Sequence, residues 1–394
     1  MINLIPTELW EYTLNDFVTA MITAGKMKKN PPSLHIPGLG DCIPVRSGRV
    51  ALLLAIRALK LPPKARIGVP LYCCPVVFKA IEAANCTHCF IDIDPSNGCI
   101  SPDDVQRKRD QIDALVAVHM FGNTCDIAAL KQAAKGKPII EDCAQSMGSK
   151  INGQLTGNFG DISFFSFRSG KYVSVGEGGV LFTRKRALRV KIANMVQELP
   201  IPSRREEIKH AMVTYIRSKL RSKPLYGLIG HHIWAIYNKK VDPAIQAPIV
   251  LKQVFKTDQT LALKRLSLVS LFVKRQRANA DYYSYHIKNV QDIAFAEKQG
   301  TYYNRYLYPL KLYSPTIRDS IAKFLFEHQI GAIQPYKDIV EYATRQHGYK
   351  GGCPVSEQTA KTILAIPNHY HLTDKEREHI VRTVNKGLAM VGIK

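Results

Sequence analysis

The sequence has few cysteines, no long hydrophobic run and few acidic residues for its size. Nine cysteines in 394 residues are too few, and too irregularly spaced, for the disulfide scaffold of a secreted protein. No stretch reaches the roughly 20 apolar residues that a membrane-spanning helix needs; the longest candidate, residues 225–237, is short and contains two histidines. The N-terminus lacks the basic start and apolar run of a signal peptide. We therefore expect a cytoplasmic protein in a reducing compartment.

Basic residues outnumber acidic ones by a wide margin. The chain has 55 Lys+Arg against 32 Asp+Glu, a formal net charge of +23 at pH 7 and a pI of about 9.6. Such a charge favours phosphate-bearing partners: nucleic acid, an anionic membrane surface, or a nucleotide-linked or phosphorylated substrate. Composition does not choose among them, and a solvated basic surface without a specific partner is an open alternative. Hydrophobic residues at 46% exclude wholesale disorder.

Short apolar runs alternate with helix-like stretches between residues 40 and 185. The helix-like stretches include Val76–Ala84 and Ile127–Ala134. This alternation predicts an α/β fold with a mostly parallel sheet that is covered on both faces. Ligands of such sheets bind beyond the carboxyl ends of the strands, so we expect the chemistry there. The predicted strands are Ile67–Tyr72, Cys89–Ile93, Ala114–Met120, Pro138–Asp142, Ile162–Phe167 and Gly179–Thr183.

The remaining chain suggests a division into two domains. We expect a large domain over residues 1–250 and a smaller C-terminal α/β domain over residues 251–394. The end of the large domain, residues 186–250, is a basic insertion followed by an apolar stretch with Trp234 and Tyr237. Such a segment could rest on anionic lipid as an interfacial helix. We favour a helical insertion that packs on the core or on a partner subunit.

Two short motifs invite a binding site. Ser47-Gly48-Arg49 opens an apolar helical run, and the start of a helix can hold a phosphate; a simple N-cap is the alternative that we favour on this observation alone. Cys86-Thr87-His88-Cys89 has the spacing of half a zinc site, but no second pair completes four ligands. We therefore expect buried thiols there and no metal site.

The segment from Glu141 to Thr183 holds the richest set of chemical groups. A carboxylate ends one predicted strand (Asp142), a serine ends the next (Ser166), and Lys171 and a glycine cluster follow. Pyridoxal phosphate (PLP) needs a lysine amine, an acidic partner for its ring nitrogen and donors for its phosphate. The segment offers these groups, but spacing alone does not distinguish Lys171 from the other lysines.

Several motifs in order resemble the DegT/StrS family of PLP-dependent sugar aminotransferases, which have the aspartate-aminotransferase (type I) fold. The resemblance covers most of residues 40–185 and, more weakly, residues 310–390. The matching pieces are Ser47-Gly48-Arg49-Val50-Ala51-Leu52, Asp92-Ile93-Asp94, Glu141-Asp142-Cys143-Ala144-Gln145, Gly157-Asn158-Phe159-Gly160-Asp161, Ser166-Phe167, and Lys171 followed by Gly176-Glu177-Gly178-Gly179.

The resemblance implies a role for each matched residue. Lys171 forms the Schiff base with PLP and then shuttles the proton, while Asp142 pairs with the ring nitrogen and keeps it protonated. Gln145 orients the oxygen side of the ring. Ser166 and the backbone N–H groups of Gly48 and Arg49 hold the phosphate.

The sequence departs from the family at positions that concern the substrate. The aromatic residue that usually stacks on the cofactor ring corresponds to Cys74, so Tyr72 or a residue elsewhere takes over the stacking, or the packing is thinner. The usual histidine after Ser-Phe is Arg168, which we expect to contact the diphosphate of a substrate. The family's G-x-N-x-R-M stretch is not visible in residues 240–265.

The resemblance implies a type I PLP-transferase fold, a homodimer, and transfer of an amino group from L-glutamate to a nucleotide-linked keto-sugar in the biosynthesis of polysaccharide or antibiotic sugars. Under this interpretation we expect a small-molecule substrate and no nucleic-acid partner. Three alternatives stay open. They are PLP-dependent dehydration, against which the presence of Lys171 argues; a PLP enzyme acting on a lipid-linked or non-sugar substrate; and a basic relative without catalysis that binds membranes or nucleic acid.

Overall fold

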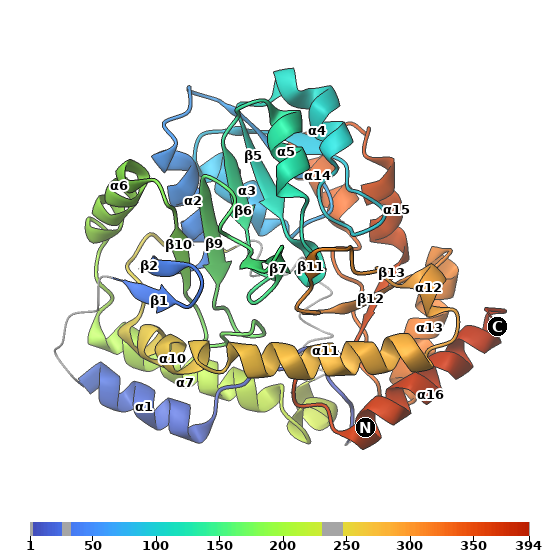
Figure 1. Cartoon of the computed structure of the whole chain (residues 1–394). Helices are drawn as coiled ribbons and strands as arrows, with labels where there is room; N and C mark the ends of the chain where they lie inside the picture. Colours follow the sequence, from blue (N-terminus) through green and yellow to red (C-terminus); the bar gives the residue numbers. More distant parts are fainter. Residues whose placement is uncertain (1–2, 26–32, 231–246, 394) are drawn as a thin grey trace.

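The computed structural model describes residues 3–25, 33–230 and 247–393. Its centre is an eight-stranded sheet in the order β1-β2-β10-β9-β6-β5-β3-β4 (Figure 1). Five neighbouring strands are parallel: β4 Thr87–Ile91, β3 Arg66–Pro70, β5 Ala114–Val118, β6 Ile139–Asp142 and β9 Ile162–Ser166. Three antiparallel strands complete the sheet: β10 Gly179–Phe182, β2 Gly40–Val45 and β1 Leu34–Ile36. The predicted α/β class with a mostly parallel sheet is confirmed.

Helices bury the faces of this sheet, which explains why its strands are continuously apolar. All five residues of β5 are buried. Helix α2 is apolar on nearly every side, because it packs against β9 and against two other helices, α3 and α6. The helices around the sheet are α2 Gly48–Ala58, α3 Val76–Ala83, α4 Pro102–Lys108, α5 Ile127–Ala134 and α6 Arg186–Gln197, with short 3-10 turns at Arg109–Gln111 and Met120–Gly122.

Most of the described part of the basic insertion, residues 186–230 and 247–250, is helical. Helix α7, Arg204–Leu220, begins at a capping box of Ser203 and Glu206. It packs against α1, Leu14–Gly25, and α10, Lys256–Leu266, along one side of the molecule (Figure 1). The buried carboxylate of Glu207 accepts hydrogen bonds from the backbone N–H groups of Lys256 and Thr257 and so caps α10. A short π-helix, Tyr226–Gly230, follows; Trp234 and Tyr237 lie outside the described residues.

A second cluster of buried apolar side chains lies in the C-terminal third. It forms around the antiparallel pair β12, Tyr308–Lys311, and β13, Ile363–Ile366. The division at residue 250 stays a prediction, because α10 and the first turns of α11 contribute to the core of the large sheet. The other elements are α11 Val269–His286, α12 Val290–Ile293, α13 Pro315–Glu327, α14 Ile339–His347, α15 Pro354–Thr362 and α16 Asp374–Met390, and a small sheet of β7 Lys150–Ile151, β8 Gln154–Leu155 and β11 Thr301–Tyr302.

No helix among residues 3–25, 33–230 and 247–393 combines the length and the apolar character that crossing a bilayer demands.

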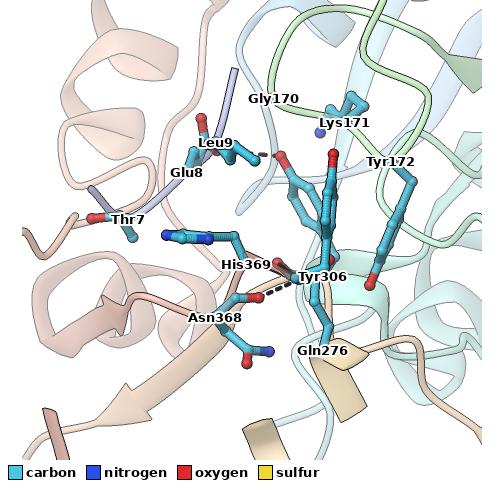
Figure 2. A pocket seen from close by; sticks show the side chains of 11 residues that line it. Thr7, Glu8, Leu9, Gly170, Lys171, Tyr172, Gln276, Tyr306, Asn368 and His369 are labelled. Carbon is cyan, nitrogen blue, oxygen red and sulfur yellow. Dashed lines mark hydrogen bonds between the residues drawn. The ribbon is translucent and has the colours of Figure 1, made fainter. Parts of the chain in front are cut away.

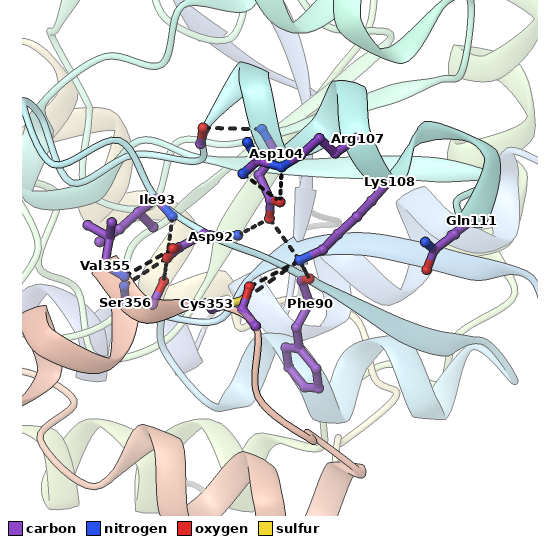
Figure 3. A network of polar contacts seen from close by, with 12 residues as sticks. Phe90, Asp92, Ile93, Asp104, Arg107, Lys108, Gln111, Cys353, Val355 and Ser356 are labelled. Carbon is purple, nitrogen blue, oxygen red and sulfur yellow. Dashed lines mark hydrogen bonds and ion pairs between the residues drawn. The ribbon is translucent and has the colours of Figure 1, made fainter.

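A buried aspartate joins the C-terminal third to the large sheet. Asp92, just beyond β4, accepts hydrogen bonds from the backbone N–H groups of Val355 (3.0 Å) and Ser356 (2.8 Å) and from the Ser356 hydroxyl (2.7 Å; Figure 3). The carboxylate therefore caps the N-terminus of α15 from a distant part of the chain. Asp104 supports it by accepting the backbone N–H of Asp92 at 2.7 Å.

Replacing Asp92 by alanine is expected to lower the free energy of unfolding by about 3 kcal/mol, because buried donors at the start of α15 lose a charged acceptor. Urea denaturation followed by circular dichroism measures the effect. Asp103→Ala, an exposed aspartate in α4, is the matched control. An Asp92→Ala protein as stable as this control would contradict the capping role.

Candidate active site

Asp142 stands at the carboxyl end of β6, in the middle of the parallel strands. Its side chain is buried, with 5% of the residue exposed, and one carboxylate oxygen accepts the backbone N–H of Ala144 at 2.9 Å. Burial raises the pKa of this carboxyl group to about 6, although the Ala144 N–H and the charge of Lys171 act in the opposite direction. No residue in the described ranges forms an ion pair with Asp142, and a buried carboxylate of this kind suits a positively charged ligand atom.

The neighbouring Glu141 has a different task. It accepts hydrogen bonds from the backbone N–H groups of Gly157, Phe159 and Gly160, and from His119 Nε2 at 3.0 Å. Its carboxylate is fully buried. Glu141 therefore holds the 157–160 loop, and only Asp142 of this acidic pair is available for a ligand.

Lys171 lies in the loop between β9 and β10. The loop closes on itself through a hydrogen bond from the Ser169 N–H to the Gly176 carbonyl at 3.1 Å. Gly170 has a φ of +91°, which a side chain would strain, so the turn before Lys171 depends on glycine. The Lys171 amine lies 4.4 Å from the centre of the Tyr306 ring and makes no hydrogen bond to any residue that the structure describes.

The charges around Lys171 set its protonation. Burial and the nearby cation of Arg168 lower the pKa of the Lys171 amine to about 8, while the charges of Glu8, Cys74 and Asp142 raise it. An amine with this pKa is partly neutral at physiological pH, as a nucleophile and proton carrier must be. Lys171 therefore lies close enough to Asp142, Arg168 and Cys74 for their charges to act on it. That these residues form one cofactor site stays a prediction.

Arg168 offers an unpaired positive charge. Its side chain is exposed, and its guanidinium has no hydrogen bond or ion pair with the described part of the chain. Although the residue is exposed, partial loss of water around the guanidinium opposes its charge. The nearby acidic and phenolic groups outweigh this effect and raise the pKa of the guanidinium above its ordinary value. A free guanidinium beside a lysine and a buried carboxylate can bind a carboxylate or phosphate of a ligand.

The start of α2 meets the end of β9. The Ser47 hydroxyl accepts the Val50 N–H at 3.3 Å, so Ser47 is an N-cap. A side chain at Gly48 would bring its Cβ within 3.3 Å of the Ser166 Cβ, and glycine therefore allows this close approach. The Arg49 guanidinium donates to the Ala247 carbonyl at 2.9 Å. Gly48 and Ser166 thus lie together, and only the backbone of Arg49, in the first helical turn, suits an anion at this point.

Gln145 connects this region to the C-terminal third. Its Oε1 accepts the Phe121 N–H at 3.0 Å, and its Nε2 donates to the Tyr336 hydroxyl at 3.2 Å. Tyr336 has a φ of +55°, an uncommon backbone conformation that is typical of functional sites. Tyr72 is fully buried, packs edge-on against Tyr336 and donates its hydroxyl hydrogen to the Pro335 carbonyl. Tyr72 therefore has no free ring face for a cofactor.

The N-terminal strap, defined as residues 3–12, also reaches this region, and its sequence predicts no such role. Glu8 of this strap lines a cavity of about 20 Å³ together with Lys171, Tyr306 and His369 (Figure 2). This volume holds about one water molecule, so it is a recess next to the ligand site. Tyr306 and Tyr336 were also missed. No local sequence signal marks any of these residues, because each reaches the site only through long-range packing.

The sequence profile of the DegT/DnrJ/EryC1/StrS aminotransferase family matches residues 36–385. Among curated proteins, GDP-perosamine synthase of Escherichia coli O157:H7 is 36% identical over 147 residues, which is 36% of this chain but only 40% of that enzyme. A protein of Acidithiobacillus ferrooxidans, named UDP-N-acetyl-3-dehydro-alpha-D-glucosamine 3-aminotransferase, is 25% identical over 360 residues, covering 90% of this chain and 86% of its own length.

Solved structures agree on the fold. The crystal structure of the aminotransferase TlmJ from Streptoalloteichus hindustanus superposes with a TM-score of 0.78 at 18% identity, covering 98% of this chain and 100% of TlmJ. This likeness confirms the predicted fold. Together with the profile match over nearly the whole sequence, it leads to one conclusion: the chain belongs to the DegT/DnrJ/EryC1/StrS aminotransferase family.

Proposed function

We propose that this chain is a PLP-dependent aminotransferase, which transfers an amino group from L-glutamate to a keto-sugar carried on a nucleotide. The observation that supports the proposal is that the Lys171 amine, which makes no hydrogen bond within the described chain, interacts electrostatically with the buried carboxylate of Asp142 at the carboxyl end of β6. Membership of an aminotransferase family and the names of the relatives that act on nucleotide sugars support it.

The residues present fit PLP. The cofactor has an aldehyde, a ring nitrogen and a phosphate. Within the described ranges the site offers an amine without a hydrogen bond, a buried carboxylate without an ion pair, and a glycine-lined helix start next to Ser166. Lys171, Asp142, Gln145, Ser166, Gly48 and the Arg49 backbone would hold it, with Cys74 next to Lys171 and Asp142. When bound, PLP supplies an aldehyde that condenses with amines and a ring that withdraws electrons from the bond being broken.

Each side chain of the site then has a separate role in the reaction. Lys171 holds or releases a proton at Nζ within the pH range in which its amine is partly neutral. Asp142 presents a negative charge that stabilises a protonated nitrogen nearby. Gln145, fixed by Phe121 and Tyr336, keeps its amide group at the same side of the site. Arg168 binds the anionic part of the substrate.

Arg168→Ala is expected to raise KM for the anionic substrate about 10- to 100-fold, which corresponds to the loss of one charged hydrogen-bonded contact. The visible absorption of the cofactor-loaded protein should be unchanged, because Arg168 does not hold the cofactor. Steady-state kinetics and an absorption spectrum test both parts. Arg345→Ala, an exposed arginine on α14, is the control. Loss of the visible band in Arg168→Ala would contradict this assignment.

The half-reaction with the amino donor tests the function itself. Purified protein loaded with PLP should absorb in the visible, and L-glutamate should bleach this band and yield 2-oxoglutarate. Parallel samples with L-glutamine and L-aspartate identify the preferred donor. Protein that stays colourless after PLP is added, or a band that no amino acid bleaches, would refute the proposed aminotransferase activity.

Exposed apolar side chains on the packed helices α1 and α7 suggest an assembly partner. Leu14, Val18 and Ile22 follow each other at helical spacing on α1, and Met212 and Ile216 do so on α7. We propose that this surface is covered in a homodimer. Exposed apolar patches of this kind usually mark an interface. Sedimentation equilibrium should give twice the chain mass, and Val18→Asp with Ile216→Asp should give the monomer.

The same surface carries exposed basic residues of α7, including Arg205, Lys209 and Arg217, so peripheral contact with an anionic membrane and a lipid-linked acceptor form the second candidate. Flotation with phosphatidylserine vesicles at low salt, reversed by high salt, would favour it.

The cytoplasm stays the proposed compartment, since all nine cysteines are unpaired.

A further inference from the structure

The Lys171 amine contacts a residue that is distant in the sequence, Tyr306. The amine lies over the ring of Tyr306, whose hydroxyl donates a hydrogen bond to Glu8 Oε1 at 3.2 Å (Figure 2). Tyr306 is 7% exposed, so its ring has little freedom to move. A chain of contacts therefore runs from the N-terminal strap through a buried aromatic ring to the amine.

The strap is fixed at both ends. Ile5 exchanges backbone hydrogen bonds with Gln329 and Gly331 in the C-terminal third. At the other end, the Ser218 hydroxyl of α7 donates to the Trp10 carbonyl, and the Tyr12 N–H donates to the Ser218 oxygen. Glu8 lies between these anchors, so its carboxylate is held at the site by backbone contacts on either side.

The loop of Lys171 is packed against the strap. A Cβ atom at Gly170 would lie 3.2 Å from Glu8 Oε2 and 3.0 Å from Trp10 Nε1. On the other side, the Tyr172 hydroxyl donates to the Asn304 carbonyl at 2.6 Å, and the Asn304 side chain accepts the Tyr306 N–H. The loop that carries Lys171 thus packs against both the strap and the segment that carries Tyr306.

We propose that Glu8 and Tyr306 are positioning residues, which together hold the free amine of Lys171 in its protonated form over the tyrosine ring whenever it is not bonded to a carbonyl carbon. The face of an aromatic ring attracts an ammonium group more strongly than a neutral amine, which makes only a weak N–H···π contact. The carboxylate of Glu8 adds a negative charge behind the ring. The pair therefore opposes Arg168, which disfavours the ammonium form.

This proposal deepens the proposed function, in which Lys171 is the reactive amine. Among the described residues, the charges with the largest effect on Lys171 are those of Arg168, Glu8, Cys74 and Asp142, and Tyr306 presents its π face. The side chains of Tyr172 and His369 line the same recess. Glu8 and Arg168 have opposite signs. Removing the charge of Glu8 should therefore lower the pKa of Lys171, and removing the charge of Arg168 should raise it. A variant that merely disorders the loop would not produce two shifts of opposite sign.

The test measures the amine directly in the protein without added cofactor. Trace acetylation with acetic anhydride between pH 6 and 10, followed by mass spectrometry of the peptide that contains Lys171, gives the pKa of this amine. Glu8→Gln and Tyr306→Leu should each lower it by about one unit, and Arg168→Gln should raise it by about one unit. Tyr306→Phe keeps the ring and should lie between the wild type and Tyr306→Leu.

Controls separate the possible failures. Lys323 on α13, labelled in the same samples, should titrate identically in every variant. Circular dichroism identifies a variant that does not fold, and Glu8→Asp, which keeps the charge, should restore the wild-type pKa. Unchanged Lys171 titration in Glu8→Gln and Tyr306→Leu would overturn the inference. A wild type that does not bind PLP would refute the proposed function instead, because the labelling does not depend on the cofactor.

Discussion

Lys171→Ala is expected to reduce turnover by at least about 10⁴-fold and to abolish covalent attachment of PLP. The variant loses both the amine that condenses with the aldehyde and the group that moves the proton, and each role is worth several orders of magnitude. The measurements are turnover with an amino donor and a keto-sugar nucleotide, and borohydride reduction followed by mass spectrometry, which should label position 171 in the wild type only.

The control is Lys323→Ala, which removes an exposed lysine from α13 and should leave both measurements unchanged. Lys171→Arg keeps a positive charge but cannot condense with an aldehyde under these conditions, so it should be as inactive as the alanine variant. A Lys171→Ala enzyme that keeps a tenth of the wild-type rate, or borohydride labelling at another lysine, would remove Lys171 from the reaction.

Asp142→Asn is expected to lower turnover and to raise stability at the same time. Turnover should fall by about 10²–10³-fold, since an amide does not supply the negative charge that stabilises a protonated ring nitrogen. The protein without cofactor should be more stable at pH 7–8, by up to about 3 kcal/mol, because the variant no longer buries an ionised carboxylate in a site without a close cation.

The pH dependence of the free energy of unfolding shows whether ionised Asp142 stabilises or destabilises the cofactor-free protein. The pKa of Asp142 is raised from 3.8 to about 6 in the folded protein, so the fold favours the protonated form. Its contribution to stability is complete below about pH 4 and is lost as the pH rises to about 6. Urea titrations of the cofactor-free protein at several pH values should show this loss in the wild type and not in Asp142→Asn. Equal pH profiles for the two proteins would contradict the burial of the carboxylate.

Local pattern was enough to predict the parallel part of the sheet. The strands β5 and β6 are buried on both faces, so their sequences are continuously apolar and easily recognised. The helix α5 coincides with the predicted Ile127–Ala134 because an N-cap at Asp126 and a periodic apolar face define it locally. Asp142 and Lys171 were assigned from the family resemblance, since neither differs in its local sequence from other acidic residues and lysines.

The rest of the site depends on contacts between distant parts of the chain. Glu8 approaches Lys171 because Ile5 forms backbone hydrogen bonds with Gln329 and Gly331. The sequence of the first twelve residues does not predict this pairing. Tyr336 faces Gln145 from a positive-φ position that no glycine or asparagine marks. Tyr72 is apolar enough to predict burial, but only its neighbours decide that its ring is covered by Tyr336.

The strap has a consequence for how the protein is made. A ribosome releases the N-terminal residues first, yet Ile5 finds its hydrogen-bond partners only after Gln329 and Gly331 have emerged. The large sheet can assemble during synthesis, but the recess beside Lys171 closes only near the end of translation. A polypeptide that terminates before residue 329 lacks both backbone partners of Ile5, so its strap has no anchor at this end beside Lys171.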